Sequence, residues 1–422
     1  MVDLHIRRPP LALTHGLTLL VALVAARLLF LYWLPQGTYS ADAKFWMIVE
    51  TALSRGENPY NTTNFLNWPP FWMQVLFAAG RVARTFDFQL VNVLRSILMT
   101  VESGVLLLTY TILRRYCSPE RGFWLTLGAI ALNPISIVLT CQHCGFDIFV
   151  AIFVLLALLF LLRFHENGDP IDWLWGCASI GLGVLTKTVP LVLMPTLAFG
   201  LRKVQWQYRI LGTLLLLGPV SLGMSIIYVL GPEAVSEKVL NYRSGGGSFG
   251  ISGLLSIAHL PNVTKAYTRF FPRCLLAFLL LCTILAQRRS RATREELPVY
   301  FLGLLAAVPA LGPGYGSQYI YWFLALLPIV FVASALGWVR RTIILFFGVA
   351  VVTYILEYAM FGPQGNFWVH LHPTADLRLL SGVMSLRWNE TWIRMPLFIS
   401  WLLMLGALVG RAGQILIRDH WQ

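Results

Sequence analysis

The sequence predicts an all-α protein that crosses a membrane many times. Of its 422 residues, 57% are hydrophobic and 12% are charged, and the mean hydropathy is +0.69. A soluble fold could not hide so much apolar surface. The apolar runs have the length of a helix and contain Gly and Pro, whereas the strands of a membrane barrel would be shorter and would alternate. We therefore predict one polytopic membrane domain over residues 1–422.

The first apolar run, residues 11–34, has the position of a secretion signal but not its other properties. It is too long, no small-residue cleavage pattern follows it, and it ends at the interfacial pair Tyr32 and Trp33. We predict a retained signal-anchor helix.

The number of spans is least defined near residues 172–201, where Pro190 and Pro195 interrupt two short runs. In all, the pattern predicts about twelve spans, at residues 11–34, 89–113, 122–140, 148–163, 172–187, 189–201, 210–230, 272–287, 298–312, 319–337, 342–361 and 395–417.

Lys and Arg residues gather on one side of this arrangement. By the positive-inside rule that side is the cytoplasm, so both termini are predicted to be cytoplasmic. The formal charge of +13 then reflects topology and does not indicate nucleic-acid binding. Arg81 and Arg84 would break the pattern if residues 67–84 crossed, so Pro70 to Arg84 is predicted as an amphipathic interfacial helix. The basic set comprises Arg7, Arg8, Arg114, Arg115, Arg121, Arg163, Arg202, Lys203, Arg209, Arg288, Arg289, Arg291, Arg294, Arg340, Arg341, Arg411 and Arg418.

The opposite, non-cytoplasmic side collects the segments with unusual residues. The first outer loop, residues 35–88, carries Asp42 just beyond the first span. The outer loop 231–271 contains a Gly-rich run at 245–250, which we interpret as a mobile lid and not as a dinucleotide-binding loop. A third outer loop covers 362–394. Flexible loops with aromatic residues around a polar cluster predict a site entered from outside and from the membrane.

Several of these elements resemble the GT-C glycosyltransferases. Asp42 after the first helix, an outer loop with an interfacial helix, and Arg95 near the start of the second span are similar to the amino-terminal module of that superfamily. The remaining elements of the resemblance are Asn58-Pro59-Tyr60, Trp68-Pro69-Pro70-Phe71, Asn133-Pro134, Gln142-His143-Cys144-Gly145-Phe146-Asp147, Leu185-Thr186-Lys187 through Met194-Pro195, and Ser317-Gln318-Tyr319-Ile320-Tyr321-Trp322. The last resembles the Gln-Tyr-x-x-Trp element of bacterial members that use polyprenyl-phosphate sugars.

The resemblance implies an inverting transfer of a hexose, with mannose favoured, from a polyprenyl-phosphate donor to a glycan or glycolipid acceptor on the outer face. Such a reaction needs a base for the acceptor hydroxyl and cations or donors for the phosphate. Asp42 is the predicted catalytic base, and Lys187 is the predicted phosphate-binding cation. No cofactor or metal is predicted. The further substrate-binding candidates are Arg243, Gln318, His143, Asp147 and Tyr60.

Each candidate also has a structural interpretation. Asp42 could cap an interfacial helix, Asp147 could serve the start of a helix, and Lys187 could extend to lipid headgroups. A structural ion-pair network is the favoured interpretation of the charges inside spans, with a phosphate contact by an arginine second. Cys141 and Cys144 lack a second ligand pair for a metal site. These intraspan charges are Arg27, Arg95 and Glu102.

A transporter or flippase of a lipid-linked sugar is the alternative function. Such proteins often show two similar halves with broken helices at the midplane. No repeat is evident between the halves here, and the polar features gather at one surface. The predicted location is a bacterial inner membrane or an ER membrane, with membrane lipids as partners and no prediction of the oligomeric state. A structural or assembly subunit is the third possibility, which would tolerate exchange of the outer charges.

Overall fold

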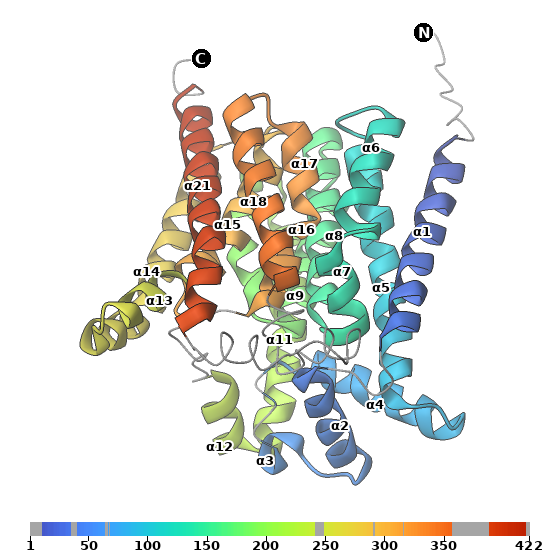
Figure 1. The fold of residues 1–422 in the computed structure, drawn as a ribbon. Helices are drawn as coiled ribbons and strands as arrows, with labels where there is room; N and C mark the ends of the chain where they lie inside the picture. Colours follow the sequence, from blue (N-terminus) through green and yellow to red (C-terminus); the bar gives the residue numbers. More distant parts are fainter. Residues whose placement is uncertain are drawn as a thin grey trace.

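The described part of the chain is a single bundle of helices (Figure 1). It contains no strand. The first helix, α1 (Leu11–Trp33), begins at the same end of the bundle at which the last helix, α21 (Trp388–Arg418), ends. The computed structural model describes residues 11–34, 40–63, 66, 68–240, 249–289, 292–314, 316–356 and 388–418.

Among the described residues, seven helices are long and apolar enough to cross a membrane, or eight if one bent pair forms a single span. The bent pair is Pro119–Ala131 with Pro134–His143, and its two halves meet at an angle of 43°. This pair contains α6 (Pro119–Thr126), η1 (Leu127–Ala131), α7 (Pro134–Val138) and η2 (Leu139–His143). The other long helices are α1, α5 (Leu90–Leu113), α8 (Asp147–Asn167), α11 (Trp206–Leu230), α14 (Pro261–Gln287), α18 (Gly337–Leu356) and α21.

The predicted count of twelve spans is therefore not confirmed. Four predicted spans correspond to shorter helices, of which α9 has 17 residues and α15 has 16. At 1.5 Å per residue these helices reach only about 26 Å, less than the hydrocarbon thickness of about 30 Å. Proline divides other runs, because it removes a backbone N–H from the helix. The shorter elements are α9 (Pro170–Thr186), η3 (Val189–Leu193), α10 (Met194–Leu197), α15 (Glu296–Leu311), η6 (Ser317–Ile320), α16 (Tyr321–Leu324) and α17 (Leu326–Ala333).

The first outer loop folds into three short helices at one end of the bundle: α2 (Ala41–Ser54), α3 (Pro59–Thr62) and α4 (Phe71–Thr85) (Figure 1). Ser40 and Asn58 cap α2 and α3 by accepting backbone N–H groups. The predicted amphipathic helix is confirmed as α4, which buries one face and exposes the other. The buried residues of α4 are Trp72, Met73, Leu76, Ala79, Gly80 and Ala83.

The opposite end of the bundle is rich in arginine ion pairs. Glu166 at the end of α8 accepts from Arg115 and from Arg294, the latter at 3.1 Å. Glu295 pairs with Arg411 of α21 at 2.7 Å. Several predicted cytoplasmic connections therefore meet in space, as a common topological side requires. Arg163–Asp172 and Arg289–Glu296 are further ion pairs of the basic set.

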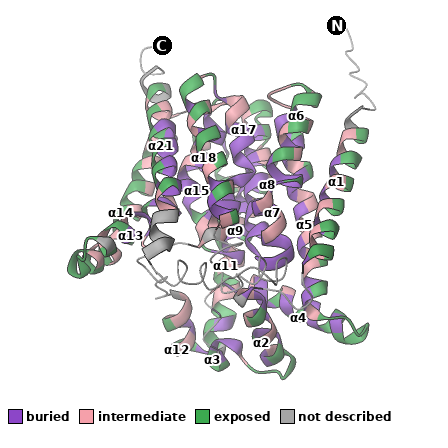
Figure 2. Ribbon diagram, viewed as in Figure 1, coloured by how far each residue is buried: buried purple, intermediate pink, exposed green. Residues whose placement is uncertain are grey.

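The core lies around α8, which is the most buried of the long apolar helices (Figure 2). In its apolar window 61% of residues are buried, compared with 17% for α1, whose outer face lies at the surface of the bundle. Since α8 runs through the centre, the groups at its first turn are held by surrounding helices. Asp147, the first residue of α8, is one of these groups.

Arg27 and Glu102 form an ion pair between α1 and α5 inside the bundle, as the structural interpretation predicted. The Arg27 Nη2–Glu102 Oε1 distance is 2.8 Å, and both side chains are fully buried. Thr140 and Tyr321 donate to the same carboxylate at 2.8 and 3.1 Å. Ser136 also contacts both charged groups. The network therefore links helices from four parts of the sequence.

We expect Arg27→Met to lower the free energy of unfolding by about 3–5 kcal/mol, because it leaves a buried carboxylate without its counterion. Arg84→Met is the matched control. Arg84 pairs with Glu50, but its side chain is 50% exposed, so the loss there should be about 0–1 kcal/mol. Thermal unfolding of the purified variants in detergent measures the loss of stability in each. Equal losses for Arg27→Met and Arg84→Met would show that the buried pair contributes no more than the exposed one.

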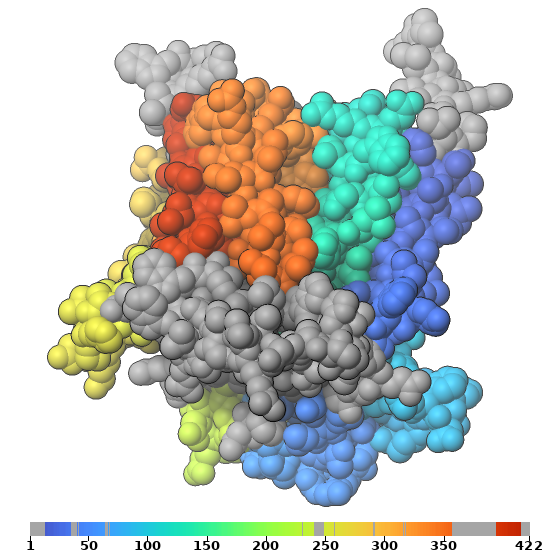
Figure 3. All heavy atoms as spheres, viewed as in Figure 1, coloured from blue at the N-terminus to red at the C-terminus, as the bar shows by residue number. Residues whose placement is uncertain are grey.

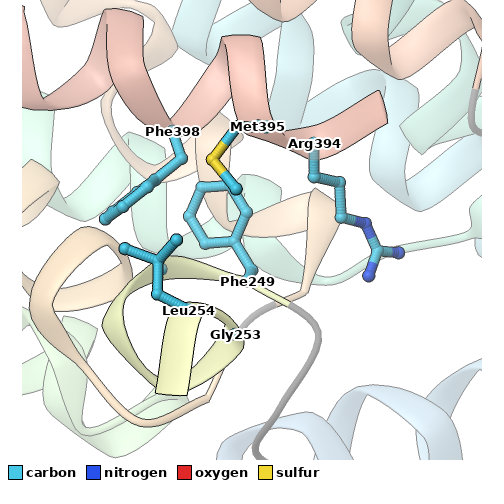
Figure 4. A pocket seen from close by; sticks show the side chains of 7 residues that line it. Phe249, Gly253, Leu254, Arg394, Met395 and Phe398 are labelled. Carbon is cyan, nitrogen blue, oxygen red and sulfur yellow. The ribbon is translucent and has the colours of Figure 1, made fainter. Parts of the chain in front are cut away.

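The predicted outer loop 231–271 is largely helical where it is described. It contains α12 (Pro232–Val235), η5 (Ser236–Leu240), α13 (Gly250–Ile257) and the first turns of α14. Phe249, just before α13, packs on Phe398 and Trp401 of α21, beside Met395 (Figure 4). Most of the Gly-rich lid, residues 245–250, and most of the third outer loop, residues 362–394, lie outside the described residues. One further short turn, η4 (Leu201–Lys203), precedes α11.

Candidate active site

The predicted base lies against a predicted substrate-binding residue. Asp42 is in the first turn of α2, and its Oδ2 lies 2.8 Å from Nε2 of His143. Ser40 holds the two segments together, because its hydroxyl donates to the His143 carbonyl at 2.7 Å and its backbone N–H donates to the Gln142 carbonyl at 3.1 Å. The two partners are therefore fixed to each other by backbone as well as by side chains.

The turn between η2 and α8 gives the site its shape. Cys144 adopts a left-handed conformation with φ of 54°, which is uncommon for residues other than glycine. Its carbonyl accepts a hydrogen bond of 3.0 Å from the Trp46 indole of α2. Gly145 follows, and an added Cβ there would lie 2.6 Å from a Leu139 methyl carbon. The tight turn places His143 and Asp147 on consecutive elements.

Lys187 and Asp147 form the second charged pair of the site. Lys187 is the C-cap residue that follows α9, and its Nζ lies 2.8 Å from Oδ1 of Asp147. The Trp322 indole N–H donates to the same oxygen. The lysine and aspartate side chains are 10% and 3% exposed, respectively. Because Asp147 is at the start of α8, its negative charge is also favoured by the helix dipole.

Aromatic rings enclose the lysine ammonium. Its nitrogen lies 5.2 Å from the ring centre of Phe146, 4.7 Å from that of Tyr319 and 4.9 Å from that of Trp322. Tyr319 and Trp322 stack with their centres 4.2 Å apart. Rings at these distances attract a cation through their quadrupoles. Lys187 is therefore held in place by a carboxylate and by three aromatic side chains, and not by lipid headgroups alone.

The two side-chain pairs are linked electrostatically. Burial pushes the pKa of the Asp42 carboxyl upward, but the hydrogen bond and charge of His143 and the charge of Lys187 together hold that pKa below its usual range. The Asp42 side chain is 29% exposed, compared with 9% for His143. The lowered pKa favours the ionised form of the partly exposed Asp42 carboxyl, and His143 is its only hydrogen-bonding partner among the described residues.

Of the remaining candidates, Gln318 lies directly before Tyr319 in η6, next to the aromatic enclosure in sequence. The Tyr60 side chain forms no hydrogen bond with Asp42, His143, Asp147 or Lys187. Its hydroxyl donates to the Trp68 carbonyl at 2.5 Å, and burial raises the pKa of Tyr60 above its usual range. Arg243 lies outside the described residues. The catalytic role of Asp42 and substrate binding by all the other candidate residues stay predictions.

Sequence reasoning did not include the aromatic enclosure among the site residues. Tyr319 and Trp322 belong to the Gln-Tyr-x-x-Trp element, so the signal was present, but their contact with Lys187 joins residues more than 130 positions apart. Arg95 donates to the Cys141 carbonyl at 2.7 Å. Within the described ranges, no group of three or more His, Cys, Asp or Glu side chains is placed to hold a metal ion.

Two comparisons relate the chain to known proteins. Residues 69–229 match the family described as dolichyl-phosphate-mannose-protein mannosyltransferase. The chain is also similar to the crystal structure of ArnT from Cupriavidus metallidurans bound to undecaprenyl phosphate, with a TM-score of 0.52 and 16% identity over 93% of this chain and 77% of that chain. No curated protein sequence gives a significant match. The structural match shows that the chain shares its fold with ArnT, and the family match covers less than half of the chain, residues 69–229.

Proposed function

We propose that the protein transfers mannose from a polyprenyl phosphate to a hydroxyl of a glycan or glycolipid acceptor, with inversion at the anomeric carbon and with Asp42 as general base. The observation that carries this proposal is the partly exposed Asp42 carboxylate, whose pKa is lowered by His143 and by the charge of the buried Lys187. The mannose is supported by the description of the family matched by residues 69–229, and the lipid phosphate also by the ligand of the ArnT crystal structure.

In the proposed step, the acceptor oxygen attacks the anomeric carbon of the donor. The bond between that carbon and the phosphate oxygen breaks, and its electron pair leaves with the polyprenyl phosphate. The hydroxyl proton passes to Asp42. A single displacement of this kind inverts the anomeric centre, and the protein contributes mainly positioning, a base and stabilisation of the leaving charge.

Lys187 supplies the positive charge for the leaving phosphate in this proposal. An ammonium has three N–H donors, and Asp147 accepts one of them. The surrounding rings exclude water from the lysine, which strengthens its interaction with an anion. Asp147 and Trp322 then act as positioning residues that hold the ammonium.

The active site is proposed to face the non-cytoplasmic side. Asp42 and the outer helices α2 to α4 lie at the end of the bundle opposite the arginine-rich end (Figure 1). The positive-inside rule supports a cytoplasmic location for the arginine-rich end, at which α1 begins and α21 ends. The membrane would be a bacterial inner membrane or an ER membrane.

The donor class is tested with the purified protein in detergent. We expect mannose transfer from a synthetic mannosyl-phosphoryl-polyprenol and no transfer from a nucleoside diphosphate mannose. The lipid tail lets the donor enter from the bilayer, and a nucleotide has no such tail. Transfer from the nucleotide sugar at a similar kcat/KM would contradict the proposal.

The pH dependence tests the role of His143. Because the pKa of Asp42 is lowered in the folded protein, its base form persists as pH falls and is lost only when pH passes through that lowered pKa. His143→Phe removes the hydrogen bond and the charge, so burial should raise the pKa of Asp42 and move the acid limb of kcat/KM to higher pH. His143→Gln keeps a donor and is the matched control. If the acid limbs of kcat/KM for the parent and for His143→Phe superimpose, His143 does not lower the pKa of Asp42.

A further inference from the structure

A ligand-sized space lies away from the Asp42 site. It is a cavity of about 260 Å³ lined almost entirely by apolar side chains of α6, η1, α17 and α18. One water needs only about 10–15 Å³ on the same measure, so this volume is much larger than that of a packing defect. Figure 3 shows α6 and α18, teal and orange, side by side on one face of the protein. The lining residues include Trp124, Gly128, Leu327, Phe331, Ile344 and Phe347.

The cavity opens to the side of the bundle. Trp124 and Ile344 line it and are 67% and 60% exposed, which is the exposure expected of apolar side chains that face lipid tails. Gly128 also lines it, and an added Cβ at Gly128 would meet nothing within 4 Å. The groove therefore accepts an apolar ligand from the membrane.

Two arginines stand at one end of the groove. The guanidinium carbons of Arg121 and Arg340 lie 5.9 and 6.0 Å from the centre of the same Phe331 ring. Neither forms an ion pair with an acid among the described residues, and the Arg340 Nε is buried without a hydrogen-bond partner. A planar guanidinium is suited to bind a phosphate group. The apolar groove and its two cations thus match a molecule with an acyl chain and an anionic headgroup.

The groove is separate from the proposed catalytic site. Arg121 is two residues beyond the start of α6, at the arginine-rich end of the bundle, whereas Asp147 is at the first turn of α8. From Asp147 the 21-residue helix α8 crosses about 30 Å to that end. From Arg121 to Gly128, seven residues along the bent pair give the groove a depth of about 10 Å.

We propose that this groove binds an anionic phospholipid from the leaflet at the arginine-rich end. One acyl chain lies in the groove beside Trp124 and Gly128, and the headgroup phosphate is bound by Arg121 and Arg340. A zwitterionic lipid would place an ammonium beside the same two cations and binds more weakly. The bound lipid fills the space between the bent pair and α18.

The test uses full-length protein in nanodiscs that contain a trace of phosphatidylglycerol with a photoreactive group on its acyl chain. We expect the probe to label peptides of residues 119–131 and 326–347 at least about tenfold more than a phosphatidylcholine probe does. Arg121→Gln combined with Arg340→Gln should remove this preference. Gly128→Leu should reduce labelling by both probes, because the new side chain fills the groove.

Two matched controls lie on the same helix, α18. Arg341→Gln removes a neighbouring exposed cation, and Gly348→Leu adds the same side chain at an open position that does not line the groove. Both should label like the parent. Equal labelling by the two lipid probes, or labelling that none of the groove variants changes, would overturn the proposal. Displacement of the probe by polyprenyl phosphate but not by unlabelled phosphatidylglycerol would also overturn it, because the groove would then hold the substrate lipid.

Discussion

Asp42→Asn is expected to fold like the parent protein and to lose about 10²–10⁴-fold in the rate of mannose transfer. An amide has nearly the shape of a carboxylate and can still bond to His143, but it cannot accept the acceptor's proton. Asp42 is partly exposed and lies in the short outer helix α2, so the substitution should leave the bundle intact. The assay is transfer from mannosyl-phosphoryl-polyprenol, with thermal unfolding measured on the same sample.

Asp87→Asn is the matched control for this variant. Asp87 is an exposed carboxylate just beyond α4 with φ of 54°, a conformation that Asn also tolerates. It should retain full activity. Transfer by Asp42→Asn within threefold of the parent would exclude Asp42 as the base. A transporter or flippase would move lipid-linked sugar without any such transfer in detergent, so the same assay also separates that alternative from an enzyme.

Lys187→Met is expected to have the second largest effect. It leaves the Asp147 carboxylate, which is 3% exposed, without its cation. Loss of one partner of a buried pair lowers the free energy of unfolding by about 3–5 kcal/mol. The same change removes the ammonium that is proposed to stabilise the leaving phosphate. Thermal unfolding measures the first effect, and transfer below the unfolding temperature measures the second.

A double variant separates these two contributions. Lys187→Gln with Asp147→Asn replaces the ion pair by neutral groups that can still hydrogen-bond, and Asn can still accept the Trp322 N–H. We expect stability to return to within about 1.5 kcal/mol of the parent, while transfer stays at least about tenfold low. Lys44→Gln, an exposed lysine of α2, should change neither quantity. Full recovery of transfer in the double variant would show that Lys187 has only a structural role.

The sequence alone singled out residues that the structure brings into contact. Asp42 stands just after the first span, and Lys187 stands at the end of another on the same predicted side. Their partners were also among the candidates, but the pairing was not, because His143 is 101 positions from Asp42 and Asp147 is 40 positions from Lys187. Which side chains meet depends on helix packing, and hydropathy does not encode that packing.

The structure agrees with the predicted grouping of basic residues at one end of the bundle but not with the predicted number of spans. The grouping of basic residues does not depend on where each helix ends. The ion pairs of Glu166 and Glu295 with arginines of the basic set agree with the prediction that this set lies on one side. Span counting depends on unbroken helices, and Pro190 and Pro195 lie in a 3₁₀ turn and a four-residue helix. Apolar runs of this length can be buried core segments as well as spans.

The central claim is that the Asp42–His143 pair and the Lys187–Asp147 pair form one site at which the lipid phosphate leaves. A cryo-electron microscopy structure of the full chain with bound polyprenyl phosphate tests it most directly. We expect the phosphate to lie within hydrogen-bonding distance of the Lys187 ammonium, in a space that the Asp42 carboxylate also faces. A phosphate bound instead at the arginine-rich end, or separated from Asp42 by packed helices, would contradict this claim.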